Sequence, residues 1–331
     1  MNKFVIRQSL LLFLTAVIWG VAFVAQSVGM EYIEPFTFNA VRNLIGAAVL
    51  IPCIALLSGG KSKSGGKSTS GGKSKSGGAL DGSGKAEGEA AASGAGFREK
   101  LKNGEYRTLL TGGVCCGVLL CVASNLQQFG IQYTTVGKAG FITAMYIVLV
   151  PVFGIFLKKK AGLKVWLAVG IAVAGLYLLC MTGGSLSLQK GDLLVLACAV
   201  VFSVHILTID YFSPKVNGVA MSCIQFLVCG LLSAVGMLLF EEPQIAQILE
   251  AWLPILYAGV LSCGVAYTLQ IVGQRGMNPT AASLILSLES AVSLLAGWLI
   301  LGQKLTQREL FGCVLMFAAI ILVQLPEKKA E

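Results

Sequence analysis

Charge and histidine are scarce in this 331-residue chain. Only 12 % of its residues are charged, it contains one histidine, and it has no C-x-x-C motif. Soluble globular proteins carry about 25 % charged residues, so this chain has too little charge to cover a water-facing surface of its size. A single histidine leaves no nitrogen-rich set of zinc ligands. These shortages argue against a soluble enzyme, a nucleic-acid-binding module and a metal site, and no cofactor is expected.

Apolar residues dominate instead, at 56 % of the chain with a mean hydropathy of +0.79. A helix that spans a membrane needs about 20 mostly apolar residues. Ten windows meet this condition: 9–29, 36–57, 109–129, 136–157, 163–182, 191–212, 219–240, 251–272, 280–301 and 309–325. The sequence therefore predicts an all-α polytopic membrane protein with ten transmembrane helices and the lipid bilayer as its surroundings.

The segment 58–106 has a different composition from the rest. The hexapeptides GGKSKS, GGKSTS and GGKSKS follow one another from Gly59 to Ser76. Repeats of Gly, Ser and Lys cannot bury a core and remain solvated. We expect a disordered linker at 58–106 that separates the first two helices (1–57) from the next three (107–184).

Lys and Arg indicate the orientation in the membrane. If the N-terminus is cytoplasmic, most of them lie on the cytoplasmic side, and the opposite side receives only Lys138, Lys190, Lys304 and Arg308. Cytoplasmic segments are the ones that carry excess Lys and Arg. We expect both termini, including the tail 327–331, in the cytoplasm, and the chain in a cytoplasmic membrane of bacterial origin.

The two halves of the chain can be laid over each other. The matched pairs are Trp19 with Phe202, Arg42 with Gln225, Gln127 with Gln270, and Tyr146 with Glu289. Each half holds five predicted helices, an odd number, so the second half (188–326) enters the membrane in the opposite direction. Inverted repeats of this kind characterise secondary transporters, whose substrate sites lie near the midplane.

Several motifs resemble those of the EamA-type branch of the drug/metabolite transporter superfamily. They are A-V-I-W-G-V-A-F around Trp19, F-x-F-x-A-x-R from Phe36 to Arg42, and the segments 137–157 and 284–322. The resemblance implies ten helices in two inverted five-helix repeats and transport of small metabolites by alternating access. In the ninth helix Ser290 stands where many members have proline, which leaves a helix break there open. Gln303 likewise replaces a glutamate at the end of that helix.

Two ionisable residues lie well inside predicted helices. Glu289 is near the midplane of the ninth helix, and Arg42 lies seven residues into the second. A charge inside a bilayer costs roughly 2.5–3.5 kcal/mol on insertion scales, so such residues usually face a cavity or a partner. One interpretation is a cavity in which Arg42 binds an anionic group and Glu289 a cationic group or a proton. The other is that the two side chains pair with each other.

Further polar or aromatic residues within the apolar windows could complete a substrate site. These candidates are Trp19, Asn39, Asn125, Gln127, Tyr146, His205, Gln225 and Gln270. Polar side chains also tie membrane helices together, so each of them has a purely structural alternative. Gly113-x-x-x-Gly117 in the third helix predicts a close contact between helix backbones.

The leading functional hypothesis is a secondary transporter. Its expected substrate is a small polar metabolite, an amino acid or a related compound, moved by alternating access with export as the expected direction. Glu289 is the candidate group for coupling transport to protons. The alternative is an efflux pump for hydrophobic drugs or toxic cations, which would need an apolar, aromatic-lined cavity and would tolerate the loss of Arg42.

Overall fold

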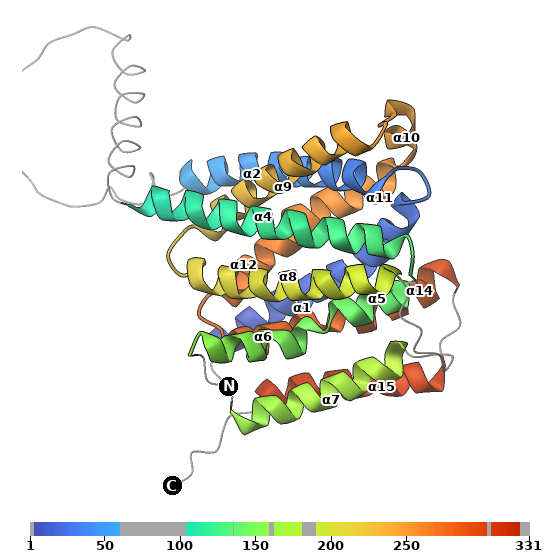
Figure 1. Cartoon of the computed structure of the whole chain (residues 1–331). Coiled ribbons are helices and arrows are strands. Elements are labelled where there is room, and N and C mark those ends of the chain that lie inside the picture. Colours follow the sequence, from blue (N-terminus) through green and yellow to red (C-terminus); the bar gives the residue numbers. More distant parts are fainter. Residues whose placement is uncertain are drawn as a thin grey trace, which may run out of the picture.

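The computed structural model describes residues 3–59, 104–134, 136–158, 162–180, 190–302 and 306–324. All regular elements within these ranges are helices, which lie side by side in one bundle (Figure 1). Most of the predicted linker and the tail 327–331 fall outside the described residues, so the linker remains a prediction.

All ten apolar windows coincide with helical residues. The first five contain α1 (Lys3–Gly29), α2 (Pro35–Gly59), α4 (Glu105–Ile131), α5 (Val136–Thr143) with α6 (Tyr146–Phe156), and α7 (Leu163–Cys180). The others contain α8 (Lys190–Phe212), α9 (Gly218–Phe240), α11 (Trp252–Leu256) with η2 (Tyr257–Tyr267) and α12 (Thr268–Gln274), α13 (Pro279–Leu286) with α14 (Leu288–Leu301), and α15 (Gln307–Gln324). A short helix, α10 (Ile245–Glu250), precedes the eighth window.

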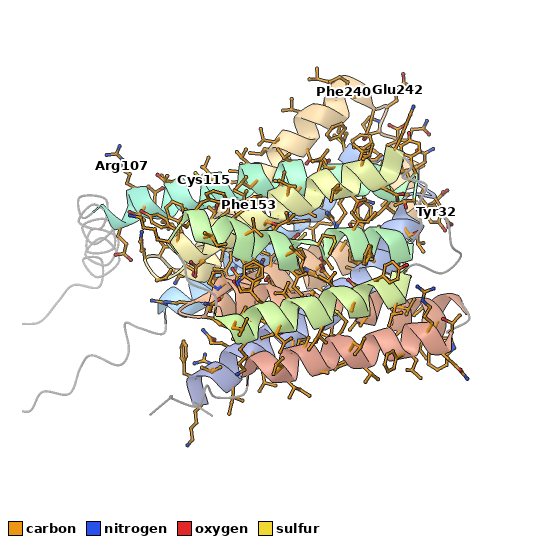
Figure 2. All side chains as sticks on the ribbon, turned by 60° about the horizontal axis from the view of Figure 1, so that its bottom comes forward. Tyr32, Arg107, Cys115, Phe153, Phe240 and Glu242 are labelled. Atoms are coloured by element: carbon orange, nitrogen blue, oxygen red, sulfur yellow. The ribbon has the colours of Figure 1, made fainter. Side chains whose placement is uncertain are left out.

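Within the described ranges, eight helical stretches are long and apolar enough to cross a membrane. The fifth and tenth windows contain shorter apolar helices, Leu163–Gly175 and Leu310–Leu322. Large apolar side chains are exposed on the outside of the bundle, which is the arrangement expected where lipid is the solvent. The protein is thus an all-helical, multi-pass membrane protein. Figure 2 shows Arg107 near one end of the bundle and Tyr32 and Glu242 near the other.

Three of the windows are not regular α-helices. The fourth is interrupted at Ala144 and Met145, between α5 and α6, and the ninth at Ser287, between α13 and α14. The eighth changes to π-helical hydrogen bonding over η2. Irregular backbone at membrane depth is tolerated where it is buried in protein or lines a cavity. The positions of these irregularities therefore point to the centre of the bundle.

Serine hydroxyls explain how the ninth window breaks without a proline. Ser283, Ser287 and Ser293 each donate to a backbone carbonyl three residues earlier, at 2.8–2.9 Å. Hydroxyl groups that bond to the backbone in this way compete with regular helical hydrogen bonding. The Ser290 hydroxyl donates instead to the Gly140 carbonyl of α5 at 2.9 Å. The residue that replaces the proline thus joins the two interrupted helices.

In the two interrupted helices, the first part of each packs on the second part of the other. α5 packs on α14 and α6 packs on α13, so the two interrupted helices run antiparallel to each other. α4 contacts α8 and α9, while α1 contacts α12, α14 and η2. The pairs α2 with α9 and α7 with α15 are also in extensive contact. The largest buried apolar cluster contains residues from both halves of the chain, including Leu12, Leu120, Ile147, Phe226 and Leu286.

The close contact predicted for Gly113 and Gly117 is confirmed, and its partner is α9. A Cβ atom built on Gly117 would lie 2.7 Å from the Val228 Cβ and 2.9 Å from the Gln225 carbonyl oxygen. A Cβ on Gly113 would lie 2.5 Å from the Ile224 side chain. Only glycine leaves room for the two backbones to approach this closely.

Replacing Gly117 by alanine should therefore destabilise the bundle. Overpacking in a tight interior typically costs about 1–3 kcal/mol. The matched control is Gly170→Ala in α7, where an added Cβ meets nothing within 4 Å. We expect the control to be neutral or slightly stabilising, because alanine is the better helix former. Thermal unfolding in detergent checks this, and equal melting temperatures for the two variants would contradict it.

Candidate functional site

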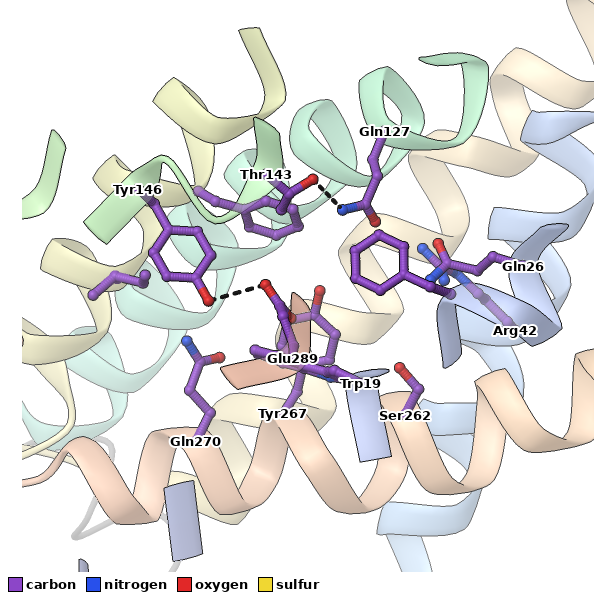
Figure 3. Close-up of a pocket in the computed structure, with 13 residues that line it drawn as sticks. Trp19, Gln26, Arg42, Gln127, Thr143, Tyr146, Ser262, Tyr267, Gln270 and Glu289 are labelled. Atoms are coloured by element: carbon purple, nitrogen blue, oxygen red, sulfur yellow. Dashed lines mark hydrogen bonds between the residues drawn. The ribbon is translucent and has the colours of Figure 1, made fainter. Parts of the chain in front are cut away.

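A cavity lies at the centre of the bundle; together with the open solvent at its mouth, its empty space is about 480 Å³. Thirteen side chains from both halves of the chain line it (Figure 3): Trp19, Phe23, Gln26, Arg42, Gln127, Thr143, Tyr146, Phe202, Ile206, Ser262, Tyr267, Gln270 and Glu289. Six of these are sequence-predicted candidates, namely Trp19, Arg42, Gln127, Tyr146, Gln270 and Glu289. The structure thus brings together residues that are up to 270 positions apart in the chain.

Glu289 lies in the first turn of α14, directly after the break at Ser287, and only 4 % of its surface is exposed. The Tyr146 hydroxyl donates a hydrogen bond to the Glu289 Oε1 at 2.9 Å (Figure 3). Tyr146 begins α6, directly after the break in the fourth window. Each of the two interrupted helices therefore supplies one partner of this bond at its point of interruption.

Arg42 is a buried cation, 4 % exposed, on α2. In the part of the chain that the structure describes, its Nε atom has no hydrogen-bond partner, and it forms no ion pair with Glu289 although both line the cavity. Its guanidinium carbon lies 5.5 Å from the centre of the Phe38 ring. The interpretation that Arg42 and Glu289 pair with each other is therefore not what the structure shows. A buried charge without a counter-charge is unfavourable unless something else neutralises it.

Other polar atoms of the lining are also buried and have no hydrogen-bond partner among the described residues. They are the Trp19 Nε1 donor and the Gln26 Oε1 and Gln270 Oε1 acceptors. Since about nine in ten buried polar groups are hydrogen-bonded, several orphaned atoms in one cavity indicate groups that a ligand can satisfy. In Figure 3, Arg42 and Gln26 lie on one side of the cavity and Tyr146 and Gln270 on the other, with Glu289 between them.

Aromatic and aliphatic side chains form the remaining wall. The Trp19 and Tyr267 rings lie 4.5 Å apart, centre to centre, and are tilted by 59°. Phe23, Phe202 and Ile206 complete this apolar part. The lining therefore combines charged and polar groups with an apolar wall. No three His, Cys, Asp or Glu side chains of the described ranges form a group that could bind a metal.

Comparison with known proteins places these observations in a family. Residues 7–71, 92–181 and 189–325 match the EamA-like transporter family, which together is most of the chain. The chain belongs to this family.

Two EamA-type relatives extend over nearly the whole chain. An "uncharacterized transporter" of Archaeoglobus fulgidus is 26 % identical over 94 % of this chain and 84 % of its own length. The "uncharacterized transporter YoaV" of Bacillus subtilis is 22 % identical over 92 % of both chains. A solved crystal structure, 16 % identical, superposes with a TM-score of 0.69 over 96 % of each chain, which shows a shared fold. This EamA-like protein is thus a membrane transporter, as the sequence predicts.

The four remaining candidate residues of the EamA-like protein lie beside the cavity and not in its lining. The Asn39 amide donates to the Asn125 Oδ1 at 2.8 Å, and the Asn125 amide donates to the Ser233 hydroxyl at 3.0 Å, so α2, α4 and α9 are connected. The fully buried His205 shares a 3.3 Å hydrogen bond with the Gln225 Oε1. These bonds match the structural alternative, in which polar side chains tie helices together.

Seven lining residues were not among the sequence-predicted candidates: Phe23, Gln26, Thr143, Phe202, Ile206, Ser262 and Tyr267. Helical spacing from Trp19 could have found two of them, because Phe23 and Gln26 lie four and seven residues later on the same face of α1. Ser262 and Tyr267 belong to η2, where π-helical hydrogen bonding changes which residues share a face. Thr143, which accepts a hydrogen bond from the Gln127 amide at 3.1 Å, ends α5 at the break.

The bond between Tyr146 and Glu289 should contribute measurably to stability. Tyr146→Phe removes the donor and leaves a buried carboxyl oxygen unsatisfied, which typically costs about 1–3 kcal/mol. Tyr133→Phe is the control, because its side chain is 58 % exposed. We expect a lower melting temperature in detergent for Tyr146→Phe alone. Indistinguishable unfolding curves for the two variants would show that the bond contributes nothing.

Proposed function

We propose that this protein is a secondary transporter that moves a small polar metabolite, an amino acid or a related compound, across the cytoplasmic membrane of a bacterial cell. Alternating access is the proposed mechanism and export the proposed direction. The observation that carries the proposal is the pair of opposite charges, Arg42 and Glu289, which line one cavity without contacting each other.

A bipolar substrate would satisfy both charges at once. A carboxylate can form two parallel hydrogen bonds with a guanidinium such as that of Arg42. An ammonium group or another donor would bind Glu289 and the orphaned Gln270 Oε1. Charged groups inside a membrane typically mark substrate or ion pathways, because retaining them without a partner is costly.

The packing of the helices supports two inverted five-helix repeats, at 1–57 with 107–184 and at 188–326. The interruptions at Ala144–Met145 and at Ser287 fall at nearly equivalent positions of the two halves under the offset of 143 that pairs Tyr146 with Glu289. Under the same offset, α5 corresponds to α13 and α6 corresponds to α14. The contact of α5 with α14 therefore has its counterpart in the contact of α13 with α6. The match to the family is also divided between residues 181 and 189, which is where the first proposed repeat ends and the second begins.

The distribution of charge supports cytoplasmic termini. Cationic residues near the end of the bundle where α1 begins are Lys3, Arg7, Arg107, Lys158, Lys215 and Arg275. The opposite end has the carboxylates Glu31, Glu34, Glu241 and Glu242, and its cations within the described residues are Lys138, Lys190 and Arg308. Since Lys and Arg accumulate on the cytoplasmic side, α1 begins in the cytoplasm in this proposal.

Binding can be measured before the substrate is known. A thermal-shift panel on the detergent-solubilised protein would include amino acids, sugars, nucleosides, polyamines and lipophilic cations. A ligand at about 100 times its Kd stabilises the folded state by about 2.7 kcal/mol. We expect a zwitterionic compound to stabilise the wild type and the control Arg107→Ala, and to have no effect on Arg42→Ala or Glu289→Gln.

The aromatic wall of Trp19, Phe23, Phe202 and Tyr267 favours one alternative, an efflux pump for hydrophobic drugs or toxic cations. In that case lipophilic cations alone would stabilise the protein, and Arg42→Ala would leave their effect unchanged. That result in the same panel would replace the metabolite proposal by the efflux proposal.

Proton coupling through Glu289 is tested by transport in proteoliposomes. Glu289→Gln keeps the shape of the side chain but cannot release a proton. We expect this variant to lose accumulation driven by a proton gradient. If Glu289→Gln transported as well as the wild type, both down and against a proton gradient, the hypothesis of proton coupling at this residue would be wrong.

A further inference from the structure

Two thiols lie where α4 packs on α9, outside the lining of the cavity. The contacts between these helices advance together along both: Gly113 meets Ile224, Gly117 meets Val228, and Cys121 and Asn125 meet Ser233. The two helices therefore run in the same direction. The backbones approach closely at the two glycines. Cys121 lies one turn beyond Gly117 on α4, and Cys229 directly follows Val228, the residue that Gly117 meets on α9.

The sulfur atoms of these cysteines occupy one small polar cluster. The Cys121 Sγ lies 3.7 Å from the Ser233 Oγ, and the Cys229 Sγ lies 3.8 Å from the Ser124 Oγ. Ser124 is one turn beyond Cys121, and Ser233 is one turn beyond Cys229, so each sulfur lies beside a hydroxyl that follows the other cysteine by one turn.

The close approach of the backbones makes a covalent link between these sulfurs feasible. A disulfide needs Cβ atoms about 3.5–4.5 Å apart, a separation that most pairs of packed helices exceed. Gly113 and Gly117 remove the side chains that would hold α4 and α9 further apart. The other cysteines on these helices are less well placed. Cys115 is exposed, Cys116 is buried in a separate apolar cluster with Ile209 and Met221, and Cys223 of α9 donates to the Ala47 carbonyl of α2 at 3.6 Å.

The two thiols differ in accessibility, which sets an order of reaction. Cys121 is partly exposed, whereas Cys229 is fully buried. The Asn125 amide also donates to the Cys121 Sγ, at 3.5 Å. An oxidant therefore reaches Cys121 first, and Cys229 is in place to react second.

We propose that Cys121 and Cys229 form an oxidation site, at which a peroxide converts the two thiols into a disulfide that joins α4 to α9. The Cys121 sulfur attacks one peroxide oxygen, breaks the O–O bond and becomes a sulfenic acid, with release of water. The Cys229 sulfur then attacks the Cys121 sulfur, and the hydroxyl leaves as a second water. In sum, two thiols and one hydrogen peroxide give one disulfide and two waters, and the sulfurs lose two electrons to the peroxide.

The link would hold together helices from the two halves of the chain. The cluster also includes Asn125, whose Oδ1 accepts from Asn39, one turn before Arg42 on α2. This consequence rests on the proposed function: if transport requires the two halves to move relative to each other, the oxidised protein is arrested. Oxidation would then act as an off switch that a thiol reductant reverses.

The site is tested by treating the purified full-length protein in lipid vesicles with hydrogen peroxide. Mass spectrometry of an unreduced digest should show a peptide pair linked through Cys121 and Cys229. The linked pair should fall to less than about a tenth in Cys121→Ser and in Cys229→Ala, because each lacks one sulfur. Cys115→Ser is the matched control on the same helix and should form the link as the wild type does.

Absence of that linked pair from the folded, oxidised wild type, or a link between other cysteines instead, would overturn the proposal. A second measurement tests the switch, with a mixture of radiolabelled amino acids as the transport probe. The oxidised wild type should transport at less than about a tenth of its reduced rate and recover with a thiol reductant, whereas Cys121→Ser should be insensitive. A disulfide that leaves the rate unchanged overturns the switch. Failure of the reduced protein to transport would contradict the proposed function, and the digest would still decide whether the disulfide forms.

Discussion

The hydrogen bond between Tyr146 and Glu289 joins two interrupted helices at the centre of the bundle, and the cavity is built around it. Each residue directly follows a break in its own helix. A carboxyl group at this depth needs a polar partner, because the bilayer offers none. This bond links the two broken helices at the point where they meet. A second bond, from the Ser290 hydroxyl to the backbone of α5, joins the same two helices.

Interrupted helices are possible here because side chains form hydrogen bonds with backbone groups that a regular helix would pair internally. In lipid every N–H and C=O must find a partner within the protein, which normally enforces continuous helices. Serine hydroxyls supply such partners in the ninth window, and Thr15 does so for η2 by donating to the Ala266 carbonyl at 3.1 Å. The same irregularities turn Thr143, Ser262 and Tyr267 toward the cavity. Local chemistry that permits a break thus also creates the lining of the site.

Charge and close packing divide the interior into two kinds of polar region. Arg42, Glu289 and the two amide oxygens of Gln26 and Gln270 line the cavity, where a ligand can reach them. Asn39, Asn125 and Ser233 instead hydrogen-bond to one another between helices and connect α2, α4 and α9. The glycine contacts of α4 with α9 lie beside this second region, so that small side chains and hydrogen bonds together hold the two halves in contact.

The amino-acid sequence by itself determined the all-helical membrane fold, the positions of its ten apolar windows and the two internal charges. These properties follow from hydropathy and from the cost of burying charge, which act on each segment separately. Only the tertiary structure decided which polar side chains share the cavity, because Gln225 and Gln270 look alike in sequence, and packing alone turns Gln270 into the lining and Gln225 toward His205. The sequence likewise did not determine whether the ninth window breaks, because it lacks the proline. The break at Ser287 depends on serine hydroxyl groups and on contact with α5.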